Sequence, residues 1–84
     1  MITIKPSAVG KLSFYGFRKG HHSGLWGKQL RYSDAWGELI ITRKNVVEMT
    51  FLDGTIASDD LTLQIIKNHI PMLLKDVSQN GGTK

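Results

Sequence analysis

The sequence predicts one small α+β domain, in which a C-terminal helix packs on one face of an antiparallel β-meander. Residues 2–57 alternate between short β-prone runs and turn residues, as the strands of a meander do. After Ser58, apolar residues recur at helical spacing. Eighty-four residues, 40% of them hydrophobic, suffice for one compact core but not for two. We therefore assign residues 1–78 to a single domain and residues 79–84 to a flexible tail.

The first two thirds of the chain predict four to five short strands. The β-prone runs are residues 2–5, 12–18, 28–32, 36–42 and 46–52. Pro6 ends the first run because it lacks a backbone donor, and Gly16 within the second run suggests a bulge. Apolar and polar residues alternate in the third and fifth runs, as in strands with one buried face. The sequence therefore predicts a sheet with one apolar side.

Turn residues separate these runs. Ser33 and Asp34 lie between the third and fourth runs, and residues 43–45 are a polar turn between the fourth and fifth. Asp53 and Gly54 are the strongest turn signal in the chain. They predict a type I′ turn because both residue types tolerate positive φ. Residues 55–57 are then expected to form a short return strand.

The last third predicts a helix over residues 59–77. Ser58 is expected to cap it, with Asp59 and Asp60 at the positive end of the helix dipole. Five apolar residues recur at spacings of three and four and so share one face: Leu63, Ile66, Ile70, Leu73 and Val77. Three further apolar residues widen this face: Leu61, Ile65 and Leu74. Pro71 should kink or break the helix. This face is expected to cover the sheet, and the alternative is a homodimer paired through it.

Positive charge is concentrated in the first half of the chain. The net charge is +4. Residues 1–37 hold six cations and one acid, whereas residues 38–84 hold five cations and six acids. Anionic partners would therefore be attracted to the first half. A small excess of basic residues also keeps a protein soluble, so charge alone does not identify a partner.

Residues 11–36 interleave aromatic rings with cations and glycines. Because large rings are usually buried, four are expected in the core: Phe14, Phe17, Trp26 and Trp36. Tyr15 and Tyr32 are expected to be the exposed pair. Exposed rings surrounded by cations would make a stacking platform for nucleic acid. The residues predicted to contact nucleic acid are Arg18, Lys19, Lys28, Arg31, Tyr15, Tyr32, His21 and His22.

Residues 20–28 form a glycine-rich loop that departs from known phosphate-binding patterns. His22 stands where a P-loop has its first glycine, and Gln29 stands where it has Ser or Thr. His21 and His22 supply at most two metal ligands, whereas a catalytic zinc site usually has three. We therefore expect no metal, no cofactor and no catalytic residues.

Residues 18–22 resemble the glycine–histidine segment of HicA-type RNA-cleaving toxins over five positions. That family places a helix before the strand that leads into its histidine. The residues that precede Phe14 here include Pro6 and a predicted strand, so no such helix is expected. A metal-free ribonuclease that uses His21 or His22 as acid and base is therefore the third of three functions considered.

The first function is binding of nucleic acid, either DNA or RNA, by a small protein that is not an enzyme. The second is a protein-interaction module, such as a small inhibitor or adaptor, whose partner carries an acidic surface. Trp26 and Arg31 would anchor that partner, because Trp, Tyr and Arg dominate interface hot spots. The protein would be a monomer or a homodimer.

The expected location is the cytoplasm, without contact to a membrane. The longest purely apolar runs have three residues, such as Leu39-Ile40-Ile41, against about 20 for a spanning helix. The first ten residues lack the apolar segment of a secretory signal. The chain has no cysteine, which suits a reducing compartment.

Overall fold

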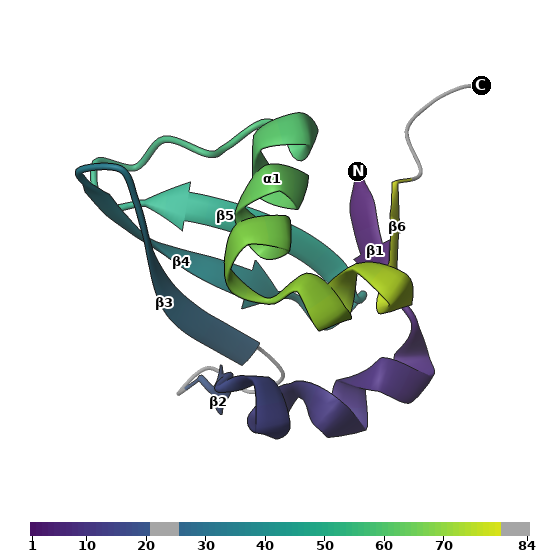
Figure 1. Cartoon of the computed structure of the whole chain (residues 1–84). Coiled ribbons are helices and arrows are strands. Elements are labelled where there is room, and N and C mark those ends of the chain that lie inside the picture. The colour runs from purple at the N-terminus through teal and green to yellow at the C-terminus, as the bar shows by residue number, and fades with distance from the viewer. Residues whose placement is uncertain (21–25, 80–84) are drawn as a thin grey trace.

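The computed structural model describes residues 1–20 and 26–79, and it contains a six-stranded sheet with α1 packed across it (Figure 1). In chain order the elements are β1 (Ile2–Ile4), the 3₁₀ helix η1 (Pro6–Tyr15), β2 (Arg18–Lys19), β3 (Trp26–Tyr32), β4 (Ala35–Ile41), β5 (Val46–Phe51), α1 (Asp59–His69), the 3₁₀ helix η2 (Pro71–Asp76) and β6 (Val77–Gln79).

The sheet is antiparallel throughout, with the strand order β2-β3-β4-β5-β1-β6. β3, β4 and β5 form a meander, and β1 adds to the outer side of β5. β6 follows the helices and pairs with β1 at the edge. The predicted α+β class is thus confirmed. β6 is an additional strand, because the strands were expected only within residues 2–57.

The core lies on one face of this sheet, which we call the covered face. The strand residues buried there are Ile2, Ile4, Leu30, Leu39, Ile41, Val47 and Met49. Phe17, just before β2, and buried residues of the helical segments and their junction complete the same cluster: Ala8, Leu12, Ile65, Ile66, Ile70 and Leu73. The apolar face of α1 is therefore used within its own domain, and a dimer paired through it would have to give up this packing.

The opposite face, which we call the open face, has no buried side chain among the described residues. The strand register places these residues on it: Thr3, Arg18, Gly27, Gln29, Arg31, Trp36, Glu38, Ile40, Val46, Glu48, Thr50 and Ser78. Because side chains alternate along a strand, the side chains of these residues, Gly27 excepted, point away from the core.

The predicted cap and the predicted break of the helix are both present. The Leu61 backbone N–H donates to the Ser58 hydroxyl at 3.1 Å. Thr62 is buried inside the first turns, and its hydroxyl donates to the Ser58 carbonyl at 2.8 Å. At Ile70 the backbone leaves helical geometry, with φ −138° and ψ 65°, and η2 begins at Pro71. The helix therefore breaks because a proline follows.

The strand predicted over residues 12–18 is wrong. Pro6 opens η1, as its fixed φ allows at a first helical position. Ala8 and Leu12, four residues apart, are its buried residues. Gly16 ends it in the left-handed region at φ 91° and donates to the Ser13 carbonyl. A helical segment thus does precede β2, and the argument against a HicA-like arrangement from a missing helix does not hold.

The turn at Asp53 differs from the predicted type I′. Gly54 has φ 93°, but Asp53 does not have positive φ. The Gly54 N–H donates to the Phe51 carbonyl at 2.9 Å, which gives a longer hairpin loop ending in a left-handed glycine. The Asp53 carboxylate accepts from the Thr55 hydroxyl at 2.7 Å and from its N–H at 2.9 Å, and these bonds lower the pKa of Asp53.

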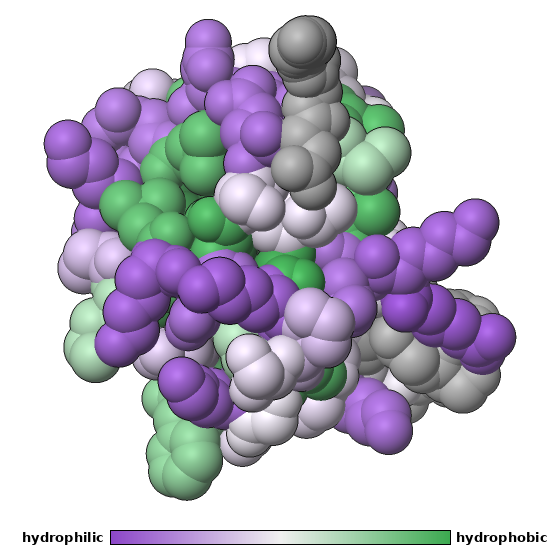
Figure 2. All heavy atoms as spheres, turned by 90° about the vertical axis from the view of Figure 1, so that its right-hand side faces the viewer, coloured by the Kyte–Doolittle hydropathy of each residue, from purple (hydrophilic) through white to green (hydrophobic). Residues whose placement is uncertain are grey.

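The C-terminal end of the domain also extends further than expected. Gln79 pairs with Ile2 in β6 rather than opening the tail, and residues 80–84 lie outside the described part of the chain. Figure 2 views the side of the molecule that lies to the right in Figure 1, and it shows many hydrophilic side chains around a smaller apolar group. None of the described helices is long and apolar enough to cross a membrane.

Candidate nucleic-acid interface

Three of the predicted cations line one hollow at the junction of β2 and β3, which we call the basic groove. It encloses about 600 Å³. Among the described residues, three cations, three glycines and two other polar residues line it: Arg18, Lys19, Lys28, Gly16, Gly20, Gly27, Gln29 and Glu38. The sequence predicted that these cations contact one ligand, and the structure brings them together.

The pairing of β2 with β3 positions the cations. Arg18 lies opposite Gly27 and Lys19 lies opposite Trp26, so the two side chains point to opposite faces. Lys28 belongs to the covered face. The lining of the basic groove therefore includes residues from both faces of the sheet where β2 pairs with β3.

Two glycines leave the room that this groove needs. At Gly16, whose φ is 91°, an added Cβ would collide with the Lys28 ammonium group. At Gly27, an added Cβ would collide with the Glu38 carboxylate, which lies across that position. Glycine at both sites thus allows a lysine and a glutamate side chain to lie directly on the backbone.

The electrostatics of the basic groove favour an anion. Arg18 and Lys19 are exposed and Lys28 is half-buried. None of the three forms an ion pair with another residue that the structure describes. Of the lining residues that the structure describes, Glu38 is the one carboxylate, so cations outnumber it by three to one. A phosphate would therefore meet a net positive site.

Arg31 lies apart from the other three cations. It is on the open face of β3, two residues beyond Gln29, which is about 7 Å along a strand. It does not line the basic groove. Its Nε donates to the Ser33 carbonyl at 3.1 Å, which orients the guanidinium group, and its direct cross-strand partner is Trp36.

The aromatic rings do not divide as the sequence predicted. Phe17 is buried and Trp26 is half-buried against the core, as expected. Trp36 and Phe14, both expected in the core, are 50% and 87% exposed. Tyr15 and Tyr32, the expected exposed pair, are both half-buried and packed against the core cluster. The exposed ring of the open face is therefore Trp36.

A signal for Trp36 was present in the sequence. The turn at Ser33 and Asp34 has two residues, so it sets Tyr32 opposite Ala35 and Arg31 opposite Trp36. Since Tyr32 shares the covered face with Leu30, the register places Trp36 beside Arg31 on the other face. Phe14 carried no comparable signal, because its environment depends on η1.

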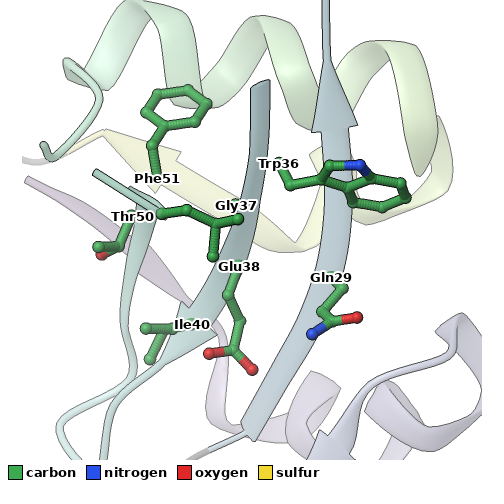
Figure 3. A pocket seen from close by; sticks show the side chains of 8 residues that line it. Gln29, Trp36, Gly37, Glu38, Ile40, Thr50 and Phe51 are labelled. Carbon is green, nitrogen blue, oxygen red and sulfur yellow. The ribbon is translucent and has the colours of Figure 1, made fainter. Parts of the chain in front are cut away.

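A second hollow, which we call the open-face pocket, begins where Trp36 projects from β4 (Figure 3). It encloses about 470 Å³. Its lining residues are Gln29, Trp36, Gly37, Glu38, Ile40, Thr50, Phe51 and Leu52. Figure 3 shows the Glu38 carboxylate and the Gln29 amide projecting below the Trp36 indole. Both of these polar residues also line the basic groove, so the two hollows are contiguous.

An exposed apolar residue, Leu52, flanks Trp36 on the β5 side. Leu52 is 83% exposed, and its N–H donates to the Trp36 carbonyl at 3.1 Å. Ile56 is 63% exposed and forms an isolated bridge with Thr50. The return strand predicted over residues 55–57 is thus reduced to this single bridge. Trp36 and Leu52 are thus exposed apolar neighbours, whereas Ile56 lies opposite Thr50, the cross-strand partner of Glu38.

His21 and His22 lie outside the described residues. Within residues 1–20 and 26–79, no three His, Cys, Asp or Glu side chains converge as metal ligands would. Comparison of the chain with protein-family models, with curated proteins and with solved structures found no match.

Proposed function

We propose that this protein binds nucleic acid, with the phosphate backbone in the basic groove and the bases toward the open face. One observation carries the proposal: Arg18, Lys19 and Lys28 line a single hollow and have no anionic partner among the described residues. Clustered, unpaired cations supply the electrostatic part of nucleic-acid affinity.

The exposed ring adds a second part. Trp36 stands half-exposed beside Arg31 on the open face, which is contiguous with the basic groove. Aromatic side chains on a sheet stack with bases that are free of a duplex. In this proposal Trp36 takes the stacking role expected of Tyr15 and Tyr32, whose rings offer less surface. A contribution of His21 and His22 stays a prediction.

Fluorescence anisotropy with labelled single-stranded DNA and RNA tests the proposal. If three phosphates are neutralised, the slope of log affinity against log salt concentration should be about −2. Replacing Arg18, Lys19 and Lys28 together by Ala should weaken binding about tenfold or more at 50 mM salt.

A matched control removes three exposed lysines outside the groove: Lys44, Lys67 and Lys75. Equal losses in the two triple variants would mean that only net charge matters. No binding of either nucleic acid at about 50 mM salt would end the proposal. The incubated RNA is also examined on a denaturing gel. Cleavage that disappears when His21 and His22 are both changed to Ala would indicate a ribonuclease instead.

A second candidate is a protein-interaction surface. The exposed neighbours Trp36 and Leu52 favour it, since exposed apolar side chains beside an arginine are typical of interface anchors. Trp26, the anchor expected from the sequence, is half-buried on the covered face and offers less surface than Trp36.

An affinity pull-down from nuclease-treated lysate tests this alternative. A partner that binds through Trp36 and Leu52 should be lost with Trp36→Ala and retained with Phe14→Ala, which removes a more exposed ring elsewhere. A partner carried by nucleic acid should instead disappear with nuclease treatment.

A further inference from the structure

We propose that the open-face pocket binds one guanine base of a single-stranded nucleic acid, stacked on Trp36 with its Watson–Crick edge against Glu38 and Gln29. The inference rests on the proposed function, and it names the base and the residues that would read it. Four observations lead to it: the size of the pocket, the exposed indole, the unpartnered carboxylate and the contiguity with the basic groove.

The pocket suits one small planar group. Its volume of about 470 Å³ lies in the range of small-ligand sites. Trp36 is half-exposed at one end of it, with Ile40 and Leu52 also in the lining. An indole beside apolar side chains gives a base a stacking surface, and each stacked base typically contributes about 5- to 150-fold in affinity.

The polar groups of the pocket are paired across two strands. Gln29 of β3 and Glu38 of β4 are direct cross-strand partners on the open face. Both side chains are exposed, and neither forms a hydrogen bond or ion pair with another described residue. An ionised carboxylate only accepts hydrogen bonds, whereas an amide both donates and accepts. The pair therefore offers acceptors at Glu38 and a donor at Gln29.

Guanine is the base that complements this pair. Its Watson–Crick edge presents two adjacent donors, N1–H and the N2 amino group, followed by the O6 acceptor. Both donors can bond the Glu38 carboxylate, and O6 can accept from the Gln29 amide. Adenine and cytosine present one amino donor beside a ring nitrogen that is an acceptor. The carboxylate would repel that ring nitrogen. Uracil presents one N–H between two carbonyl oxygens.

The position of Glu38 between two cationic regions supports a role in base recognition. Glu38 lines both hollows, with Arg18, Lys19 and Lys28 on one side and Arg31 beside Trp36 on the other. A carboxylate at this place would weaken the binding of a polyanion unless it forms a hydrogen bond with a base. A strand whose phosphates follow the cations would bring one base onto Trp36, directly above Glu38.

The test uses fluorescence anisotropy with labelled oligouridylates of eight nucleotides that carry one central G, A, C or inosine. The wild-type protein should bind the G-containing strand about tenfold more tightly than the A-containing strand. Inosine keeps N1–H and O6 but lacks the N2 amino group, so its affinity should fall between the two.

Variants separate base reading from simple charge. Glu38→Gln should lower the affinity for the G strand and leave or raise the affinity for the A strand. Glu48→Gln is the matched control, because Glu48 is a carboxylate of the open face that lines neither hollow. It should raise both affinities alike. Trp36→Ala should weaken both strands, and Trp36→Phe should restore most of the loss.

Failures of the two proposals look different. Equal affinity for all four strands, together with loss of binding in the basic-groove variant, would overturn the guanine site and leave nucleic-acid binding standing. Equal tightening of the G and A strands by Glu38→Gln and by Glu48→Gln would likewise overturn base reading. Absence of binding to every strand would overturn both proposals.

Discussion

Arg31 and Trp36 are direct cross-strand partners on the open face, one residue pair from the turn that joins β3 to β4. The guanidinium group is held by its bond to the Ser33 carbonyl, and the indole is half-exposed next to it. A cation and a ring are thereby placed side by side at the rim of the open-face pocket. Because a two-residue turn fixes this register, Arg31 and Trp36 share one face of the hairpin.

The exposure of Trp36 can be measured directly, since Trp26 is the only other tryptophan in the chain. Iodide should quench the fluorescence of the wild-type protein in part. Trp36→Phe should leave an emission that is poorly quenched, because Trp26 packs against the core. Trp26→Phe should leave one that is readily quenched. The opposite pattern would contradict the strand register described here.

The cost of replacing Gly37 follows from the space around it. A Cβ at Gly37 would lie 2.7 Å from the Thr50 carbonyl oxygen and 2.7 Å from the Met49 methyl group, so the backbone of β5 would have to move. Gly37→Ala should lower the free energy of unfolding by about 1–3 kcal/mol in urea denaturation. Gly10→Ala is the control, because nothing lies within 4 Å of a Cβ there. Equal stability of the two variants would refute the packing argument.

The cap of α1 should be worth a measurable part of the stability. Ser58→Ala removes the hydroxyl that accepts the Leu61 N–H, leaving one donor of the first turn unpaired within the protein. The free energy of unfolding should fall by about 0.5–2 kcal/mol. Ser7→Ala, at an exposed position in η1, should change it by less than about 0.5 kcal/mol. A Ser58 variant as stable as the wild type would show that water replaces the cap without cost.

The Asp53 turn predicts a specific acid sensitivity. The Thr55 hydroxyl, followed by the Thr55 N–H, lowers the pKa of Asp53 from its ordinary value of 3.8. Because the folded pKa is lower than the unfolded one, the turn contributes stability above the unfolded value. That contribution is lost as the pH falls through the folded pKa.

Thr55→Val removes the hydroxyl and keeps the N–H, so the pKa of Asp53 should rise toward 3.8. Titration of the Asp53 carboxyl group by NMR checks this shift. Thr3→Val, at a distant open-face position, serves as the control and should leave the Asp53 titration where it is in the wild type. An Asp53 titration that is the same in the Thr55 variant would assign the lowered pKa to the backbone alone.

The candidate site was only partly accessible from the residue pattern. Arg18, Lys19 and Lys28 were predicted as ligands of one partner, and they do line one hollow. The residue pattern does not indicate Glu38, because it lies ten residues beyond Lys28 and meets the groove only through the pairing of β3 with β4. Trp36 was expected in the core, since large rings are usually buried.

Short-range interactions explain which features of the fold could be read from neighbouring residues alone. The Ser58 cap, the break at Pro71 and the alternation along β3 each depend on residues within a few positions of one another. Proline cannot donate a hydrogen bond, and a serine hydroxyl reaches the N–H three residues on, whatever the rest of the chain does.

Contacts between distant residues decided the remainder. Residues 12–18 contain strong β-formers, yet burial of Ala8 and Leu12 in the common core makes residues 12–15 part of a 3₁₀ helix. β6 exists because β1, more than 70 positions earlier in the chain, leaves an edge for it to pair with. The free energy of burying apolar surface is gained only when the whole sheet and its helices assemble, so it overrides local preferences that differ by about 1 kcal/mol.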